Sequence, residues 1–263
     1  MPSIKGFLSN LNRLALAALA GLGVVAFGLS VAKPAVAANM VSLTASPTAK
    51  ASTESYWTPE RFANAKPMIM HASGKAALGT KKSTAKPSAP VPGAGPTYPY
   101  DPALAVQLYT PNAKAAVSAV TPELVGTGGF PYTVNRLYPV PGTFRQFPYA
   151  LVGQLFFTIP DVGDFVCSAS VIRRAVIATA GHCVSDGNGN FFTNWVFVPA
   201  LSFGKAPYGK WNWNQVVVTN NWHFGGGGVP NIQDDALIVW NNKTLKGVTG
   251  PNGDFVGFFG FEF

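Results

Sequence analysis

The chain has 263 residues with 19 Lys and Arg, 11 Asp and Glu and 2 Cys, and its charge is unevenly distributed. Before Arg136 there are eleven basic and four acidic residues, whereas from Arg136 onward there are eight and seven. A basic chain can bind nucleic acid when its positive side chains cluster. Here the lysines are scattered through Pro- and Ala-rich sequence, so we expect a solvated tail and no nucleic-acid partner.

Residues 1–38 have the pattern of a secretory signal peptide. Lys5 and Arg13 precede the weakly apolar run 14–32, and Ala35-Val36-Ala37 offers a small-residue cleavage site. A membrane anchor is the alternative, because a run of this length just suffices to span a bilayer. No positive cluster follows the run closely, however. We therefore expect cleavage near Ala37 or Ala38, a secreted product and no stable membrane anchor.

Residues 39–129 are dominated by Ala, Pro, Ser, Thr and Lys. Such a composition buries too little apolar surface to offset the entropy lost on ordering the chain. The sequence therefore predicts a mostly disordered propeptide or linker. Short helical pieces are conceivable around 102–108 and 113–120, where Ala and Leu recur.

Residues 130–263 change to aromatic and β-branched runs separated by Gly, Pro, Asn and Asp, which is the pattern of short strands and tight turns. Helical patterns are nearly absent. Six strands in this region suffice to close one small barrel, so we predict an all-β fold. The predicted strands are 150–159, 165–172, 176–180, 194–199, 214–218 and 236–240.

Two cysteines and a histidine are the residues most suggestive of chemistry. In an exported chain Cys167 and Cys183 are expected to form a disulfide, which would contribute about 3 kcal/mol in the loop-entropy model and fix His182 in place. His182 follows an apolar strand, and an imidazole can take and return a proton near neutral pH. A single histidine is nevertheless more often a satisfied core residue.

The segment Thr179-Ala180-Gly181-His182-Cys183, with Cys167 sixteen residues upstream, resembles the histidine motif of trypsin- and chymotrypsin-like serine proteases. Segments at 147–158, 166–170, 194–200 and 206–209 resemble the secreted bacterial branch that includes the glutamyl endopeptidases. The resemblance covers roughly residues 145–245. It implies a chymotrypsin-like six-stranded barrel, a Cys167–Cys183 disulfide, peptide-bond hydrolysis and His182 as the general base.

A histidine base needs a carboxylate that fixes its tautomer, and two candidates open the strand 236–240. The family resemblance matches Asp234 to the triad aspartate. Strand alternation places Asp234 on the face of Ala236 and Ile238, with Asp235 on the other. We therefore predict Asp234 as the partner of His182 and a solvated turn position for Asp235.

The family's nucleophilic serine lies in a Gly-Asp-Ser-Gly-like loop of a second barrel, and no serine follows Ser202 here. Ser168 and Ser170 lie beside Cys167 and match no nucleophile motif. The expectation is an incomplete peptidase domain over 130–263, with the second barrel largely missing and little activity by itself. The alternative is a secreted, non-catalytic binding module with a protease-like barrel.

The remaining candidates point to packing rather than to a ligand. His71 and His223 have no neighbours at metal-ligand spacing, so no metal and no cofactor is expected. Trp211, Trp213 and Trp222 are expected to pack rather than to form a binding surface. We expect a monomer that acts on protein or peptide substrates after its pro-region is trimmed, with Arg136 and Arg145 as hypothetical cleavage points.

Overall fold

The computed structural model describes residues 39–70, 89–111, 142–245 and 247–261. These residues all fall in one structural unit, 36–263. The predicted signal peptide, the helical piece at 113–120, His71 and Arg136 lie outside the described residues.

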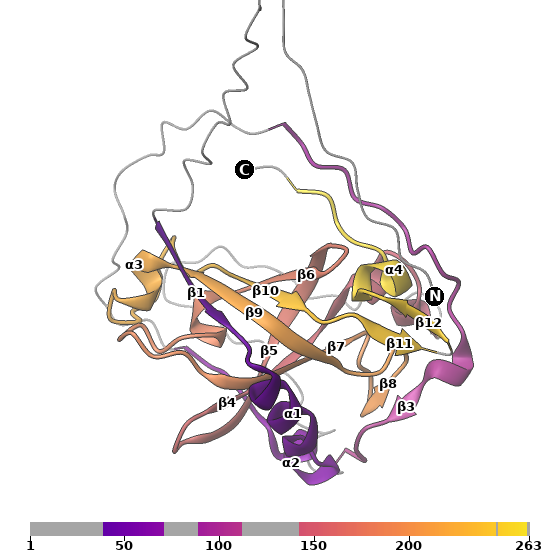
Figure 1. Ribbon diagram of the computed structural model, residues 1–263, viewed down its shortest axis with the longest axis horizontal. Helices are drawn as coiled ribbons and strands as arrows, with labels where there is room; N and C mark the ends of the chain where they lie inside the picture. The colour runs from indigo at the N-terminus through magenta and orange to yellow at the C-terminus, as the bar shows by residue number, and fades with distance from the viewer. Residues whose placement is uncertain (1–38, 71–88, 112–141, 246, 262–263) are drawn as a thin grey trace, which may run out of the picture. The chain divides into compact units, whose positions relative to one another are not determined.

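A closed antiparallel barrel forms the centre of the fold (Figure 1). Its strands follow the order β9-β10-β6-β5-β4-β7, and the pairing of β7 with β9 closes the ring. Each of the six predicted strands overlaps one of them, so the predicted all-β fold with a chymotrypsin-like six-stranded barrel is confirmed. The barrel strands are β4 (Val152–Ile159), β5 (Gly163–Arg173), β6 (Val176–Thr179), β7 (Thr193–Pro199), β9 (Trp211–Thr219) and β10 (Ala236–Trp240).

The barrel interior is filled by alternate side chains of these strands, as the pleat requires. Leu155 and Phe157 of β4 are fully buried, and Trp195 meets Trp213 edge to face with ring centroids 4.8 Å apart. The tryptophans at 211, 213 and 222 are all buried. The expectation that they pack rather than form a surface is therefore confirmed.

The expectation of disorder over 39–129 is wrong for residues 39–70. Strand β1 (Met40–Thr44) pairs with β9, along which it lies in Figure 1. Helices α1 (Pro47–Tyr56) and α2 (Pro59–Asn64) follow, and β2 (Lys66–Pro67) runs parallel to β5. Trp57 lies between the two helices and Phe62 lies within α2. Their rings stack with centroids 5.0 Å apart, and both rings cover Phe156 on the outer face of β4. A few well-placed aromatic side chains thus order a segment whose average composition predicts none.

The described part of 89–111 is also attached to the barrel unit. Val91 and Ala94 form bridges with Phe261 and Phe258. The helical piece expected at 102–108 is only a 3₁₀ turn, η2 (Pro102–Leu104), followed by β3 (Val106–Gln107), which pairs with β8 (Lys205–Ala206). Extended pairing with a neighbouring strand replaces the helix because it satisfies the backbone of this short stretch.

Short elements complete the fold. The remaining elements are η3 (Thr143–Arg145), η4 (Tyr149–Leu151), η5 (Gly181–Cys183), α3 (Asn220–His223), β11 (Lys243–Leu245), β12 (Val248–Gly250) and α4 (Asn252–Val256).

Among the residues that the structure describes, no helix is both long and apolar enough to cross a membrane.

Candidate active site

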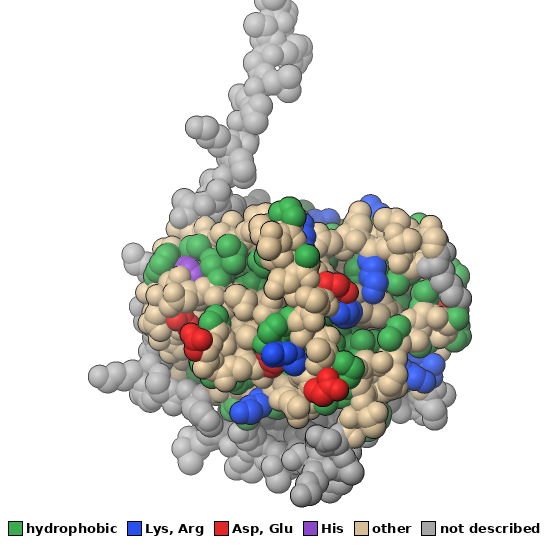
Figure 2. Space-filling view, turned by 60° about the horizontal axis from the view of Figure 1, so that its bottom comes forward, with side chains coloured by type: hydrophobic (Ala, Val, Ile, Leu, Met, Phe, Trp, Pro, Cys, Tyr) green, Lys and Arg blue, Asp and Glu red, His purple; other side chains and the backbone are tan. Residues whose placement is uncertain are grey.

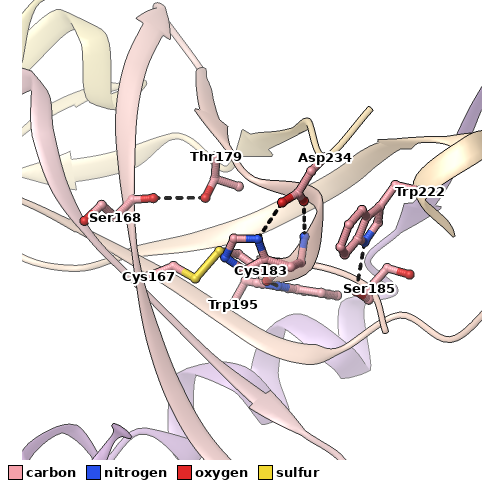
Figure 3. The surroundings of a disulfide bond; sticks show 9 residues. Cys167, Ser168, Thr179, Cys183, Ser185, Trp195, Trp222 and Asp234 are labelled. Carbon is pink, nitrogen blue, oxygen red and sulfur yellow. Dashed lines mark hydrogen bonds and ion pairs between the residues drawn. A yellow bond between two sulfur atoms is a disulfide. The ribbon is translucent and has the colours of Figure 1, made fainter. Parts of the chain in front are cut away.

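His182 is held at two points by one carboxylate (Figure 3). Its Nδ1 lies 2.7 Å from Asp234 Oδ2, and its backbone N–H donates to Asp234 Oδ1, also at 2.7 Å. Both side chains keep limited exposure, 20% for His182 and 14% for Asp234. The carboxylate therefore fixes the ring and the backbone of His182 together.

The register of two strands brings these residues together. In the antiparallel pair of β6 and β10, Thr179 lies opposite Ala236. The end of β6 and the start of β10 therefore meet at one edge of the barrel. His182 lies three residues after Thr179, and Asp234 lies two residues before Ala236.

Asp235 has no such contact with His182 and is exposed. Partial desolvation raises its pKa, and the neighbouring charge of Asp234 adds to the effect. The carboxylate predicted from sequence, that of Asp234, is therefore the one that contacts the His182 imidazole.

The predicted disulfide is present. Cys167 of β5 and Cys183 of η5 are joined, with their Cα atoms 6.3 Å apart (Figure 3). The indole N–H of Trp195 also donates to the Cys183 carbonyl at 3.2 Å. The residue that follows His182 is thus fixed both covalently and by a buried hydrogen bond.

Gly181 is required by the close approach of two groups. A Cβ atom at this position would lie 2.7 Å from Trp222 Cγ and 3.0 Å from Asp234 Oδ1. Real Cβ atoms essentially never approach another atom as closely as 2.7 Å, so a larger residue would push the indole away and crowd the carboxylate. The glycine of the motif therefore lets Trp222 pack directly against the turn that carries His182.

Trp222 is a part of the site that the sequence analysis missed. It is buried, and its ring centroid lies 6.2 Å from that of His182. The hydroxyl of Thr219 accepts the Trp222 backbone N–H and donates to the carbonyl of Gln233, next to Asp234. Helix α3 and the aspartate loop are thus tied together, with Trp222 covering one side of the His182–Asp234 pair. From sequence alone, only an estimate of how deeply Trp222 is buried could have suggested its place beside the His182–Asp234 pair.

A second histidine, His223, follows Trp222 in the chain and is buried. His223 Nδ1 is 2.7 Å from the hydroxyl of Ser185, whose carbonyl accepts the indole N–H of Trp222. Burial lowers the pKa of His223, although the charge of Asp186 opposes that shift. The imidazole is therefore favoured in its neutral form.

His182 opens onto a hollow of about 450 Å³ whose walls include Met68, Gln154 and Ser168. Ser168 shares the hollow, but in the described part of the chain no serine hydroxyl is hydrogen-bonded to the His182 ring. Nε2 is therefore the ring nitrogen left for an incoming group. As a chemical unit, the site offers an oriented proton acceptor beside an accessible depression.

The same region contains a group of potential metal ligands. The ligand atoms of Cys167, His182 and Cys183 lie within 4.8 Å of one another. Both sulfur atoms are bonded to each other, so neither supplies the thiolate that a metal site needs. The geometry therefore favours a disulfide beside a histidine over a metal centre.

Charged side chains on the face shown in Figure 2 are interspersed, with Lys and Arg beside Asp and Glu among hydrophobic and other residues. Phosphate binding depends on clustered basic side chains. The described residues on this face form no basic stripe of that kind.

Comparison with known proteins gives similarity to solved structures over part of the chain, and two proteases are among them. Protease Anisep from Arthrobacter nicotinovorans is 34% identical, with a match that covers 41% of this chain and 47% of that one and a TM-score of 0.35. The thermostable serine protease AL20 from an extremophilic microorganism is 35% identical over 38% of this chain and 45% of that one, with a TM-score of 0.32. The matches thus span less than half of either protease. No protein-family model and no curated protein matches the chain.

Proposed function

We propose that the chain carries the histidine–aspartate half of the catalytic site of a secreted serine endopeptidase. The observation that carries this proposal is the double contact of Asp234 with the ring and backbone of His182. A carboxylate on Nδ1 keeps that nitrogen protonated and leaves Nε2 as the proton acceptor. Catalysis by general base needs this tautomer.

The proposed reaction is acyl transfer. A serine oxygen attacks the peptide carbonyl carbon, and its proton passes to His182 Nε2. Nε2 then returns that proton to the leaving amine as the C–N bond breaks, and water repeats both steps to release the acid. Asp234 stabilises the imidazolium that forms in between. The serine and the oxyanion hole would come from outside the sequence given, so this chain alone should be nearly inactive.

Secretion and processing belong to the same proposal. The signal-peptide pattern of residues 1–38 and the disulfide both suit export. Of the two hypothetical cleavage points, we favour Arg136, because Arg145 lies in η3 and its carbonyl accepts a hydrogen bond of 2.6 Å from Tyr208. We assign the chain to the glutamyl endopeptidase-like branch as part of this proposal, on the sequence segments at 147–158, 166–170, 194–200 and 206–209 that resemble it.

The test is the intact mass of the native secreted protein, measured with and without a serine-directed fluorophosphonate probe. A mass above that of this chain, which rises by one probe adduct, is the expected result. A mass that fits a chain ending at Phe263, with no adduct, would refute the peptidase proposal for this product. The non-catalytic binding module would then take its place.

A further inference from the structure

A second hollow adjoins the one at His182. It has a volume of about 840 Å³, and Gln154 and Ser168 line both hollows. Its other walls come from the start of β4, from the turn at 142–149 and from the connection between β7 and β8. A chain bound at His182 could therefore continue into this second hollow, which we term the Phe203 groove.

Phe203 is presented to the groove by an unusual turn. Ser202 and Lys205 exchange two backbone hydrogen bonds of 3.0 and 2.9 Å, so Phe203 and Gly204 form the two-residue tip. Both have left-handed φ angles, 49° for Phe203 and 76° for Gly204. Asn, Asp and Gly are the usual residues at such a tip, and a bulky side chain there is an outlier. The turn thus keeps an aromatic residue where folding alone favours a different one.

Neighbouring backbone fixes this turn from behind. The N–H of Leu108 donates to the Gly204 carbonyl at 2.8 Å, and the Gln107 side chain donates to the Phe203 carbonyl at 3.3 Å. A Cβ atom at Gly204 would collide with the carbonyl oxygen of Tyr109. The backbone of Phe203 is therefore tightly placed, although 73% of the residue is exposed.

Other groove residues share this exposed, apolar character. Tyr149 and Val152 line the same groove and count among the exposed large hydrophobic residues. Exposed apolar residues that gather in a concave surface commonly mark a binding site. Lys205 is the charged side chain in the lining, so a ligand with a negative charge near its apolar part would be complementary.

We propose that the Phe203 groove is an exosite that binds the polypeptide substrate away from its scissile bond. The bound segment would place a large apolar side chain against Phe203 and an acidic residue near Lys205. This inference rests on the proposed function, because the groove continues the hollow at His182 and would hold a chain whose cleaved bond lies there.

The experiment titrates the full chain with a short peptide that contains Phe followed by Glu in an otherwise Gly-Ser sequence. Binding is followed by NMR through the backbone amides of Gly153, Ser202 and Lys205, and a peptide with Ala in place of Phe and Glu serves as the ligand control. We expect saturable shifts with the first peptide and much smaller ones with the second. In Phe203→Asn the dissociation constant should rise about tenfold or more, as for a buried aromatic contact.

Asparagine is chosen because it adopts left-handed φ readily. The melting temperature of Phe203→Asn should stay the same or rise, so a loss of binding cannot be attributed to unfolding. Val162→Asn is the matched control, because Val162 is also apolar and 67% exposed, in the turn between β4 and β5, but does not line the groove. This variant should bind the peptide as the unaltered protein does.

Several outcomes would overturn the exosite. The first is that the peptide causes no amide shifts in the unaltered protein. The second is that the unaltered protein and Phe203→Asn bind the peptide with equal dissociation constants. The last is that the amide shifts depend on protein concentration when no peptide is present. The first would fit a groove covered by the chain's own residues 112–141, and the last a second copy of the chain. Because binding needs no serine, the two proposals can fail separately. If binding depends on Phe203 but the native product has no peptidase activity, the exosite proposal stands and the proposed peptidase function is refuted.

Discussion

At the scale of single residues, the candidate site depends on which carboxylate meets His182. Asp234 accepts from both the ring and the backbone of that residue, whereas Asp235 is exposed. A hydrogen bond to a charged group contributes about 1.5–3 kcal/mol. The two adjacent aspartates therefore provide a variant and its matched control.

In Asp234→Asn, the Nδ1 proton of His182 should lose its strong acceptor. We expect the downfield imidazole proton resonance of the unaltered chain to disappear in Asp234→Asn and to persist in Asp235→Asn, with stability reduced by about 1–3 kcal/mol only in the former. Proton NMR and urea unfolding measure these effects. Persistence of the resonance in Asp234→Asn would show that the imidazole is oriented by another group.

His223 makes stability depend on pH. Its pKa is lowered from 6.5 by burial in the folded state, so the unfolded chain binds more protons at mildly acidic pH. Stability should therefore be fully present above about pH 6.5 and fall as the pH drops below it, by at most about 1.4 kcal/mol for each unit by which the pKa is lowered. The raised pKa of Asp235 acts in the opposite direction.

The test compares urea unfolding of the unaltered chain and of His223→Gln from pH 7.5 down to pH 5. Asp235 is present in both proteins, so its effect cancels in the difference. Glutamine cannot take up a proton, and the loss of stability towards low pH should be smaller in the variant. Parallel pH profiles would mean that His223 titrates equally in the folded and unfolded chain.

Sequence was informative for His182, Cys167 and Cys183 because a local motif carries them. Asp234 followed from the family resemblance together with the alternation of the strand that it precedes. Trp222 and Phe203 could not be assigned roles in the same way, since one depends on contacts between α3 and η5 and the other on a turn fixed by β3. Such tertiary contacts leave no periodic signal in the chain.

At the scale of elements, residues 39–70 show where composition misleads. Ser46 and Thr58 cap α1 and α2 by accepting backbone N–H groups, and Pro follows each cap at the first helical position. These are recognisable helix starts, but the Ala- and Lys-rich surroundings mask them. Trp57 then anchors both helices, with its indole N–H donating to the Asn194 carbonyl at 2.6 Å.

Trp57→Ala should destabilise the whole domain, because the indole is buried against Phe62 and Phe156. The expected cost is about 3–5 kcal/mol, the range for truncating a large buried aromatic residue. Ile69→Ala is the control, since Ile69 is 57% exposed in the same segment and should change stability by less than about 0.5 kcal/mol. Equal unfolding midpoints for Trp57→Ala and the unaltered chain would show that residues 39–70 are not part of the cooperative unit.

At the scale of the whole molecule, the barrel could be predicted from sequence because most of its strands are short runs rich in aromatic and β-branched residues, separated by turns. Its attachments could not. Strand β1 pairs with β9, β2 with β5, and β3 with β8, and the bridge between Ala94 and Phe258 adds a fourth contact. In each case a weak local pattern gains its structure from a partner far along the chain, and the expected pro-region therefore becomes part of the folded unit.

This arrangement predicts the product of cleavage at Arg136. The cut separates β1, α1, α2 and β3 from the barrel strands covalently, but the strand pairings and the buried Trp57 and Phe62 remain. The two pieces should stay together as a non-covalent complex because separation would expose that apolar surface. Limited trypsin digestion followed by native mass spectrometry and a denaturing gel tests this directly. We expect the mass of the complex of both pieces in the native spectrum and two bands on the denaturing gel. A folded barrel fragment that appears alone in the native spectrum would show that the N-terminal segment is dispensable once the chain is cut.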